Sequence, residues 1–307
     1  MISIIGSGKI GSNVALHVAL HGLDDITLVD VVKGLPQGEA ADLMHMLSAY
    51  GSDIQVKGSN DFSSISGSDL VIVAAGFGRK PGQTRLDLMN SNAGIIHDVV
   101  KQIKNYAPHS VLMMVTNPLD VMTYIAYKVS GFPRNRVVGM SGTLDGARLR
   151  GFIAQKLGVS VASVEPMIIG EHGENMLPVP NYTTVGGIPC TKFMSSSEFE
   201  TILKLTRGVA AEVIAAKGAT IHGPAAAVTV LADAIVNDRK KVLNASTYLD
   251  GEYGYKDIVM DVPIIASATG VEKIIEIDLD KDEKNELQKS YSTLREAIAR
   301  LSPDTIP

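Results

Sequence analysis

A histidine, a carboxylate and an arginine stand in surroundings that suit acid–base chemistry on an anionic molecule. His172 lies in a glycine-flanked turn that follows the apolar residues Ile168 and Ile169. Histidine exchanges protons near neutral pH, and neighbouring glycines let other groups approach closely. Asp145 and Arg148 are three positions apart near the start of a predicted helix, so both project from one face. The alternatives are a structural histidine and an ordinary surface ion pair.

A second cluster of positive charge lies in segment 74–85, which follows the apolar run Leu70–Val73. The segment carries Arg79, Lys80 and Arg85 among three glycines and a proline. Arginine offers a planar fork that matches a carboxylate, and the glycines favour closure over a ligand. The alternative is a solvated basic loop.

The first thirty residues have the pattern of a dinucleotide site. An apolar run, Ile2–Ile5, precedes Gly6-Ser7-Gly8-Lys9-Ile10-Gly11 and a helical pattern, and a second run ends in Asp30. The glycines allow a tight turn, close approach of a pyrophosphate and helix packing, while the acid binds ribose hydroxyls. Since a carboxylate repels a 2′-phosphate, Asp30 favours NAD over NADP, although Lys33 lies nearby.

The same alternation of strand and helix continues to about residue 140. It predicts strands at 54–57, 70–75, 110–115 and 137–140, and helices at 38–50, 86–106 and 121–130, with Pro118 at a first helical position. We therefore predict an α/β fold, a Rossmann doubly wound parallel sheet, over residues 1–141. Asn117 and segment 74–85 follow strands, at the sheet edge where ligands bind.

The pattern changes after Met140. A long helix from Thr143, its predicted N-cap, to Leu157 precedes short strands, more helices and two apolar runs at 242–247 and 257–265. We predict an α+β substrate and catalytic domain over residues 142–307. The absence of a low-complexity linker favours tight packing of the two parts.

Composition excludes several classes of protein. The 307 residues carry a formal charge of -5, which does not favour a nucleic-acid partner. The single cysteine, Cys190, excludes an intramolecular disulfide and a cysteine-rich metal site. His17 and His21 are four positions apart but lack a third ligand, so no metal is predicted. The N-terminus leads straight into a strand and no run reaches about 18 apolar residues, so we expect a cytoplasmic protein without a membrane partner.

Five motifs, in order and spacing, resemble those of the lactate/malate dehydrogenase family. They are Gly6-x-Gly-x-x-Gly11 with Asp30, Arg79-Lys-Pro-Gly-x-x-Arg85, Val115-Thr-Asn-Pro118, Gly142-Thr-x-Asp145-x-x-Arg148 and Gly170-Glu-His-Gly173. The resemblance covers nearly the whole chain. It implies an NAD-dependent enzyme of small 2-hydroxy acids that forms a homodimer or homotetramer.

The resemblance also implies a role for each motif residue. His172 would be the proton acceptor and donor, Asp145 its partner, Arg148 the clamp on the C1 carboxylate, and Arg85 the group that polarises the C2 carbonyl. Asn117 would hold the substrate oxygen. The cofactor would contact Gly6, Ser7, Gly8, Lys9, Ile10, Gly11, Asp30, Asn92, Val115, Thr116 and Asn117.

Arg79 indicates which member of the family the chain resembles. It stands where lactate dehydrogenases have a neutral glutamine, and it would pair with the second carboxylate of malate and oxaloacetate. Gln83 departs from the methionine common in malate enzymes. The alternatives are a lactate or broad 2-hydroxy acid dehydrogenase, an NAD-dependent glycosidase with a metal site, and a non-catalytic NAD-binding protein.

Overall fold

Short apolar runs in the first half of the chain form parallel strands. The computed structural model describes residues 1–78, 85–302 and 305–306. Within these ranges the strands are β1 (Ile2–Ile5), β2 (Ile26–Val29), β3 (Val56–Ser59), β4 (Leu70–Val73), β5 (Val111–Met114) and β6 (Val137–Gly139). They lie in the order β3-β2-β1-β4-β5-β6, and each neighbouring pair is parallel. The predicted doubly wound sheet is confirmed, with its topological switch between β1 and β4.

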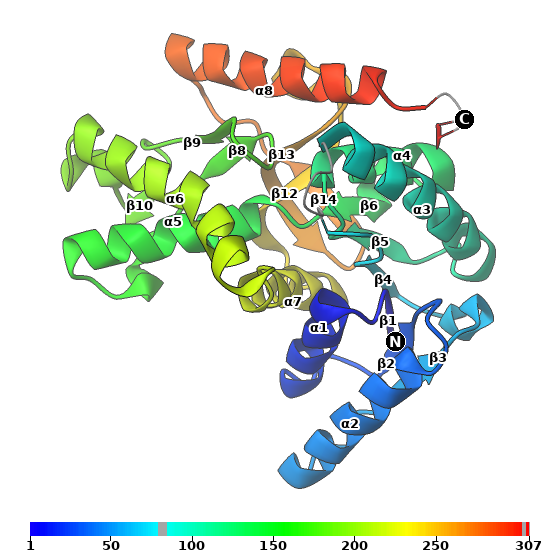
Figure 1. The fold of residues 1–307 in the computed structure, drawn as a ribbon. Coiled ribbons are helices and arrows are strands. Elements are labelled where there is room, and N and C mark those ends of the chain that lie inside the picture. The colour runs from blue at the N-terminus through cyan, green and yellow to red at the C-terminus, as the bar shows by residue number, and fades with distance from the viewer. Residues whose placement is uncertain (79–84, 303–304, 307) are drawn as a thin grey trace.

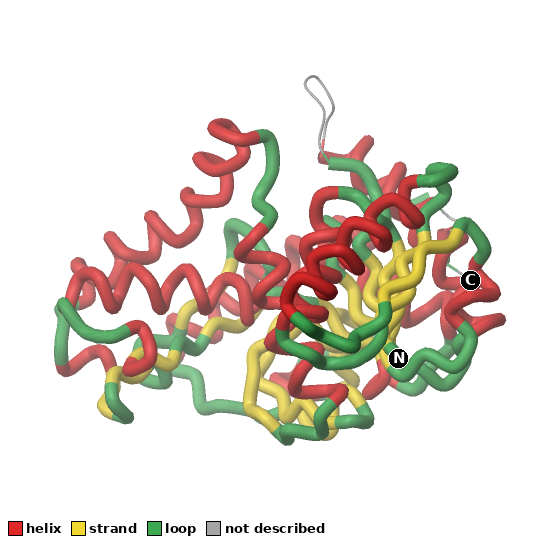
Figure 2. Tube along the Cα trace, turned by 90° about the horizontal axis from the view of Figure 1, so that it is seen from below, coloured by secondary structure: helices red, strands yellow, loops and turns green. Residues whose placement is uncertain are grey.

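Helices lie on both faces of this sheet (Figure 1, Figure 2). They include α1 (Lys9–Leu20), α2 (Leu35–Tyr50), α3 (Arg85–Tyr106), α4 (Leu119–Ser130) and, from the second half of the chain, α7 (His222–Val236), which packs against α1. Gly51 and Gly131 end α2 and α4 in the left-handed conformation, with φ of 67° and 65°. A glycine adopts this conformation without a steric cost, so each of the two helices ends at a glycine of the sequence.

The second half of the chain contains helices and mostly antiparallel strands. Besides α7, its α-helices are α5 (Gly142–Leu157), α6 (Ser196–Lys217) and α8 (Lys281–Ala299). The strands are β7 (Val164–Glu165), β8 (Ile168–Gly170), β9 (Met176–Pro178), β10 (Thr184–Val185), β11 (Ile188–Pro189), β12 (Lys241–Asp250), β13 (Lys256–Ser267) and β14 (Gly270–Ile274). This mixture agrees with the predicted α+β character.

The main sheet continues from the first half of the chain into the second. β12 pairs with β6 at Ser246 and Gly139, and β13 pairs with β8 at Asp261 and Gly170. β12 and β13 form a long antiparallel pair between these two contacts. The result is an 11-stranded sheet among the described residues, so hydrogen bonds and not a flexible linker join the two parts.

Several local predictions were wrong in detail. The helix predicted at 38–50 begins three residues earlier, at Leu35. Thr143 is not the N-cap of α5: Ser141 precedes the helix, and the Thr143 hydroxyl donates to the Asn244 carbonyl of β12 at 2.8 Å. Pro118 stands just before α4 and not inside it. β3 begins two residues later than predicted, since β2 sets its register and Gly58 passes beneath α2, where a Cβ would lie 2.1 Å from the Pro36 carbonyl oxygen.

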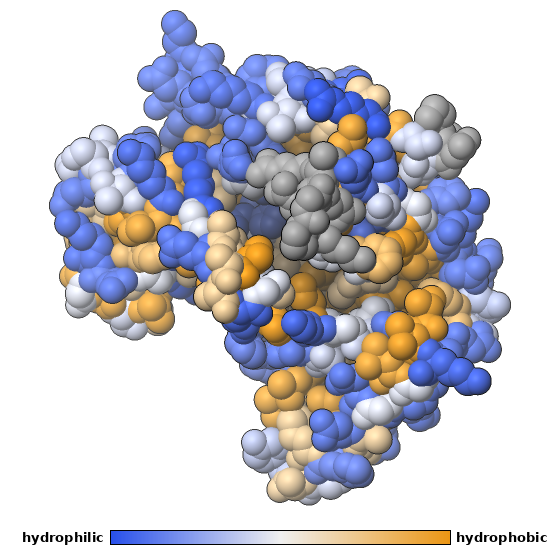
Figure 3. All heavy atoms as spheres, in the orientation of Figure 1, coloured by the Kyte–Doolittle hydropathy of each residue, from blue (hydrophilic) through white to orange (hydrophobic). Residues whose placement is uncertain are grey.

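Two buried clusters stabilise the fold. One spans the main sheet and its helices, and the other lies between α5, α6 and the small strands. Figure 3 shows hydrophilic and hydrophobic side chains intermixed on the face in view, and an outline that is notched between the part carrying α5 and α6 and the part carrying α1 and α2. None of the described helices is long and apolar enough to cross a membrane.

Gly11 allows α1 to pack closely against the turn at Gly6, which follows β1. A Cβ at Gly11 would lie 1.7 Å from the Gly6 carbonyl oxygen, whereas a Cβ at Gly8 would meet nothing within 4 Å. Gly11→Ala should therefore destabilise the fold by about 1–3 kcal/mol, although alanine is the better helix former. Gly8→Ala is the matched control: it replaces the N-cap residue without a clash, so it should lower the melting temperature by much less than Gly11→Ala. Equal melting temperatures for parent and Gly11→Ala would contradict this packing.

Candidate active site

The end of β8 places His172 in a half-buried turn. Gly170 has φ of 96°, and a Cβ there would lie 2.7 Å from the Ser290 hydroxyl oxygen of α8. Only glycine fits this conformation and this contact. The strand therefore ends against α8, and the chain turns toward α5.

His172, Asp145 and Arg148 form one hydrogen-bonded cluster. The Nδ1 of His172 lies 2.7 Å from Oδ2 of Asp145, and Nη1 of Arg148 donates to Oδ1 of the same carboxylate at 2.8 Å. Asp145 is 1% exposed, so the pair of Asp145 and Arg148 is not the ordinary surface ion pair that sequence alone allowed. With Nδ1 held by the carboxylate, Nε2 is the atom that can exchange a proton with a ligand.

The cluster favours a charged imidazole. Burial lowers the pKa of His172, but the negative charge and hydrogen bond of Asp145, with the charge of Asp120, outweigh it and raise the pKa to about 9. Burial raises the pKa of Asp145. The charges and hydrogen bonds of His172 and Arg148 have the larger, opposite effect, so the pKa lies below its usual value. The site can therefore accept a proton and hold it.

A second acidic residue supports the turn, and no role was predicted for it from the sequence. Asp120, in the first turn of α4, accepts the backbone N–H of His172 at 2.7 Å and is 3% exposed. An acid in the first turn of a helix is common, because it interacts favourably with the helix dipole. Its position after Asn117 and Pro118, at a strand end that carries other site residues, was the available signal.

Two cavities lie beside the cluster. Arg148 lines a cavity of about 390 Å³ together with residues of α6 and segment 220–224. His172 and Asp120 line another of about 280 Å³, with Pro118 and residues of α8. The cavity beside Arg148 combines apolar walls with a guanidinium group, as a site for a small carboxylate requires.

The ends of β4 and β5 are tied together by Asn92 and Thr116. Asn92 accepts the Phe77 N–H at 2.8 Å and donates to the Asn117 carbonyl at 2.7 Å, while the Thr116 hydroxyl donates to the Ala75 carbonyl at 2.6 Å. Asn92 is 1% exposed. Its observed contacts hold the two strand ends in place, and Val115 and Thr116 lie beside them at the end of β5.

The glycine loop fits a dinucleotide. α1 begins at Lys9, so its unpaired N–H groups face the open space at Gly8. The buried Ser7 hydroxyl has no hydrogen-bond partner among the described residues, and the Ser7 N–H donates to Oδ2 of Asp30 at 2.7 Å. A phosphate group at the loop would satisfy the hydroxyl. Ile10, Gly6 and Gly11 complete the loop that sequence predicted.

Part of the predicted site lies outside the described residues. This applies to Arg79, Lys80 and Gln83, and to the side chain of Arg85, the first residue of α3. Within the described ranges, no group of three or more His, Cys, Asp or Glu residues is arranged to hold a metal ion.

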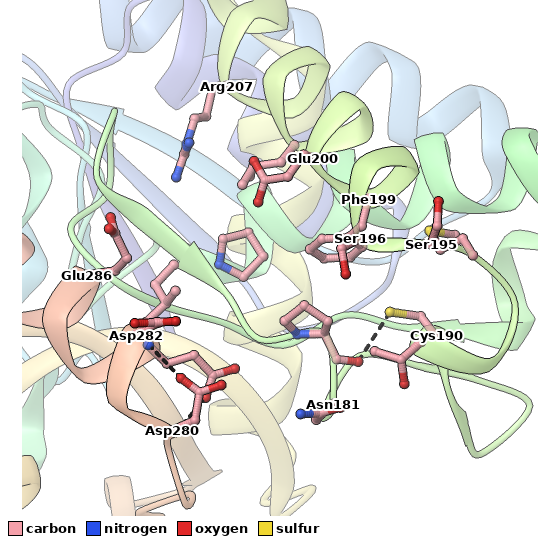
Figure 4. A pocket seen from close by; sticks show the side chains of 17 residues that line it. Asn181, Cys190, Ser195, Ser196, Phe199, Glu200, Arg207, Asp280, Asp282 and Glu286 are labelled. Atoms are coloured by element: carbon pink, nitrogen blue, oxygen red, sulfur yellow. Dashed lines mark hydrogen bonds between the residues drawn. The ribbon is translucent and has the colours of Figure 1, made fainter.

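A larger cavity, of about 700 Å³, lies apart from His172 between α6, α8 and segment 177–195. Figure 4 shows Glu200 and Arg207 reaching toward it from α6, and Asp282 and Glu286 from α8. The Cys190 thiol, also at this cavity, donates to the Pro180 carbonyl at 3.2 Å. None of the described site residues lines this cavity, so size alone does not locate the chemistry.

Comparison with known proteins gives one consistent result. A sequence model described as lactate/malate dehydrogenase, NAD binding domain, matches residues 1–139, and one described as lactate/malate dehydrogenase, alpha/beta C-terminal domain, matches residues 142–302. The malate dehydrogenase of Caldivirga maquilingensis is 44% identical over 305 residues, 99% of each chain.

Solved structures agree with the sequence matches. That of the malate dehydrogenase from Aeropyrum pernix has a TM-score of 0.97 at 42% identity and covers 99% of both chains. The lactate dehydrogenase of Cryptosporidium parvum, solved with lactic acid and β-nicotinamide adenine dinucleotide, has a TM-score of 0.94 at 38% identity and covers 100% of this chain and 98% of its own.

The raised pKa of His172 makes stability depend on pH. Because the folded-state pKa is about 9 and the ordinary value is 6.5, the stabilisation by charged His172 is fully present below pH 6.5 and is lost as pH rises through 9. The melting temperature of the parent should therefore fall more steeply over this window than that of His172→Asn. His45→Asn, at an exposed position of α2, should follow the parent. Parallel curves for the parent and His172→Asn would contradict a charged imidazole.

Proposed function

The chain belongs to the lactate/malate dehydrogenase family, and we propose that it catalyses the NAD-dependent interconversion of malate and oxaloacetate. The observation that supports this most strongly is the cluster of His172 and Arg148 around the buried Asp145 carboxylate, which places a proton carrier beside a group that binds carboxylates. Relatives named malate dehydrogenase match over nearly the full length.

His172 is the acid and base of the proposed reaction. Its Nε2 accepts the hydroxyl proton when malate is oxidised and returns it to the carbonyl oxygen when oxaloacetate is reduced. Asp145 holds Nδ1 at 2.7 Å, which fixes the ring and stabilises the imidazolium that forms. Since the carboxylate is buried, water competes little for it.

Three arginines bind the two carboxylates and the carbonyl in this proposal. Asp145 is the only described hydrogen-bonding partner of the Arg148 guanidinium, which leaves the other N–H groups of Arg148 for the C1 carboxylate. Arg85 polarises the C2 carbonyl, where negative charge develops, and Arg79 pairs with the distal carboxylate. Asn117, held through its carbonyl by Asn92, lies at the end of β5 and contributes to substrate and cofactor binding.

The cofactor is NAD, which accepts or supplies the hydride when it is bound. The loop Gly6–Gly11 and the first turn of α1 would hold its pyrophosphate, and Asp30 would bind the adenosine ribose. In the structure Asp30 already lies against the loop, because its carboxylate accepts the Ser7 and Val32 N–H groups at 2.7 and 2.9 Å. This carboxylate would repel the 2′-phosphate of NADP.

The surroundings of the site complete the proposal. We place the NAD-binding domain at residues 1–141 and the catalytic and substrate domain at 142–307, joined through the common sheet. The ranges matched by the two family models support this division. We also propose a homodimer or homotetramer, from the resemblance, and a cytoplasmic location, from the single cysteine.

A lactate dehydrogenase is the second candidate, because one such enzyme also matches the whole chain. The test compares kcat/KM for oxaloacetate and pyruvate, each with NADH and NADPH. An unpaired buried charge costs about 3–5 kcal/mol, so oxaloacetate should be favoured by about two to four decades. NADH should be favoured over NADPH. Equal kcat/KM values for the two substrates would contradict the malate assignment.

Arg79 should control this preference. Arg79→Gln removes the proposed partner of the distal carboxylate, so the ratio of oxaloacetate to pyruvate should fall by about two decades. The matched control is Lys80→Gln, which removes the neighbouring positive charge and should leave the ratio unchanged. A ratio unchanged in Arg79→Gln, or lowered equally in both variants, would show that Arg79 does not contact that carboxylate specifically.

A further inference from the structure

Asp120 uses both oxygens of a buried carboxylate to hold the histidine turn. Oδ2 accepts the backbone N–H of His172 at 2.7 Å, and Oδ1 accepts the hydroxyl of Ser246 on β12. Bonds of this kind to an ionised carboxylate are about twice as strong as neutral ones. Asp120 therefore fixes the backbone of the residue whose side chain Asp145 fixes.

A chain of polar contacts continues from Ser246 toward Asp261. The Ser246 hydroxyl also donates to Ser141 Oγ at 2.8 Å, and Ser141 in turn faces Asp261. A hydroxyl carries one proton. Ser246 therefore shares its proton between Asp120 and Ser141.

The burial of Asp261 agrees with a neutral carboxyl. It is 2% exposed, and its Oδ1 has no hydrogen-bond partner among the described residues. An ionised oxygen without a partner would be costly in the core. Burial, with the nearby charges of Asp120 and Asp145, raises the pKa of Asp261 well above its ordinary value, against the opposing effects of Ser141 and His172.

The chain of hydrogen bonds crosses between the two halves of the molecule. Asp120 begins α4 beside the β5 end that carries Asn117, Ser141 follows β6, and Ser246 and Asp261 lie on β12 and β13. Ser246 pairs with Gly139, and Asp261 pairs with Gly170, two residues before His172. The histidine is thus tied to the strand end that holds the substrate and cofactor residues.

The charges facing Asp120 favour its ionised form at neutral pH. Burial raises its pKa to about 6, with a contribution from Glu171, while the Ser246 hydroxyl and the charge and N–H of His172 lower it. His172 itself faces Asp145, Asp120 and Arg148, of which only the arginine disfavours the imidazolium. Ionised Asp120 is thus the second negative charge near the ring.

We propose that Asp120 is a positioning residue for His172: its ionised carboxylate holds the histidine turn through the backbone N–H and, as a second negative charge beside Asp145, keeps the imidazole protonated. This inference rests on the proposed role of His172 as proton acceptor and donor.

Asp120→Asn tests the charge with little change in shape. The amide oxygen can still accept the His172 N–H, and the amide nitrogen can donate to Ser246. The measurement is the NMR titration of 13Cε1-labelled histidine, in which His172→Asn identifies the His172 signal among seven. The imidazole pKa should fall by about one unit in Asp120→Asn. In kinetics, the pH at which kcat/KM for oxaloacetate reduction declines should fall equally, because reduction needs a protonated imidazole.

Asp257→Asn is the matched control. Asp257 lies on β13 and also binds α4, through the Tyr124 hydroxyl at 3.1 Å and the Lys128 ammonium at 2.6 Å. Its replacement removes a carboxylate that joins α4 to the β12–β13 pair, as Asp120 does, but one that does not contact the histidine turn. The pKa of His172 should stay at the parent value in this variant, whatever its melting temperature.

Ser246→Ala provides a second test that does not depend on the folding of Asp120→Asn. It removes the hydroxyl that favours ionised Asp120, so the imidazole pKa should again fall, by less than in Asp120→Asn. An unchanged His172 pKa in either folded variant, or an equal fall in Asp257→Asn, would overturn the proposal. A parent that does not reduce oxaloacetate would instead refute the proposed function, while the titration would still decide the role of Asp120.

Discussion

The carboxylate of Asp145, buried between two cations, is the interaction on which the site depends. Its two oxygens contact His172 and Arg148 separately, so one side chain positions both the proton carrier and the carboxylate clamp. A carboxylate that is 1% exposed requires such partners, because burial of an unpaired charge is strongly unfavourable. The same two contacts therefore stabilise the Asp145 carboxylate and fix the positions of His172 and Arg148. Arg148 comes from the same helix face as Asp145, so only the approach of His172 requires tertiary structure.

The continuous sheet supplies that approach. Asp145 is on the helix that follows β6, and His172 follows β8, which reaches β6 through β13 and β12. Each of these neighbours is hydrogen-bonded to the next, so the distance between the two side chains depends on strand pairing and not on a flexible linker. The glycine at position 170 allows α8 to close against the turn from the other side. The site is thus rigid where proton transfer needs a fixed geometry.

Sequence predicted those features that have a local signal. The parallel strands and the glycine loop follow from apolar runs that end in glycine or in an acid, and Asp145 with Arg148 follows from helical spacing. The junction of β6 with β12 had no such signal, because a single residue pair, Ser246 with Gly139, joins them. Thr143 was misassigned as an N-cap because its partner, the Asn244 carbonyl, is distant in sequence. Asp120 was missed since a first-turn acid usually serves its own helix.

The three buried aspartates near His172 illustrate how environment sets the charge of one residue type. Asp145 faces two cations, which lower its pKa; Asp120 faces an N–H, a hydroxyl and the imidazole; Asp261 faces other carboxyls and keeps an unpartnered oxygen. Three adjacent ionised carboxylates would repel one another, so one of them is favoured as the neutral acid. Burial alone would lower the pKa of His172 and make the imidazole a poor proton acceptor. The negative charges that remain reverse this effect, and they give the half-buried His172 the affinity for a proton that reversible dehydrogenation of a hydroxy acid requires.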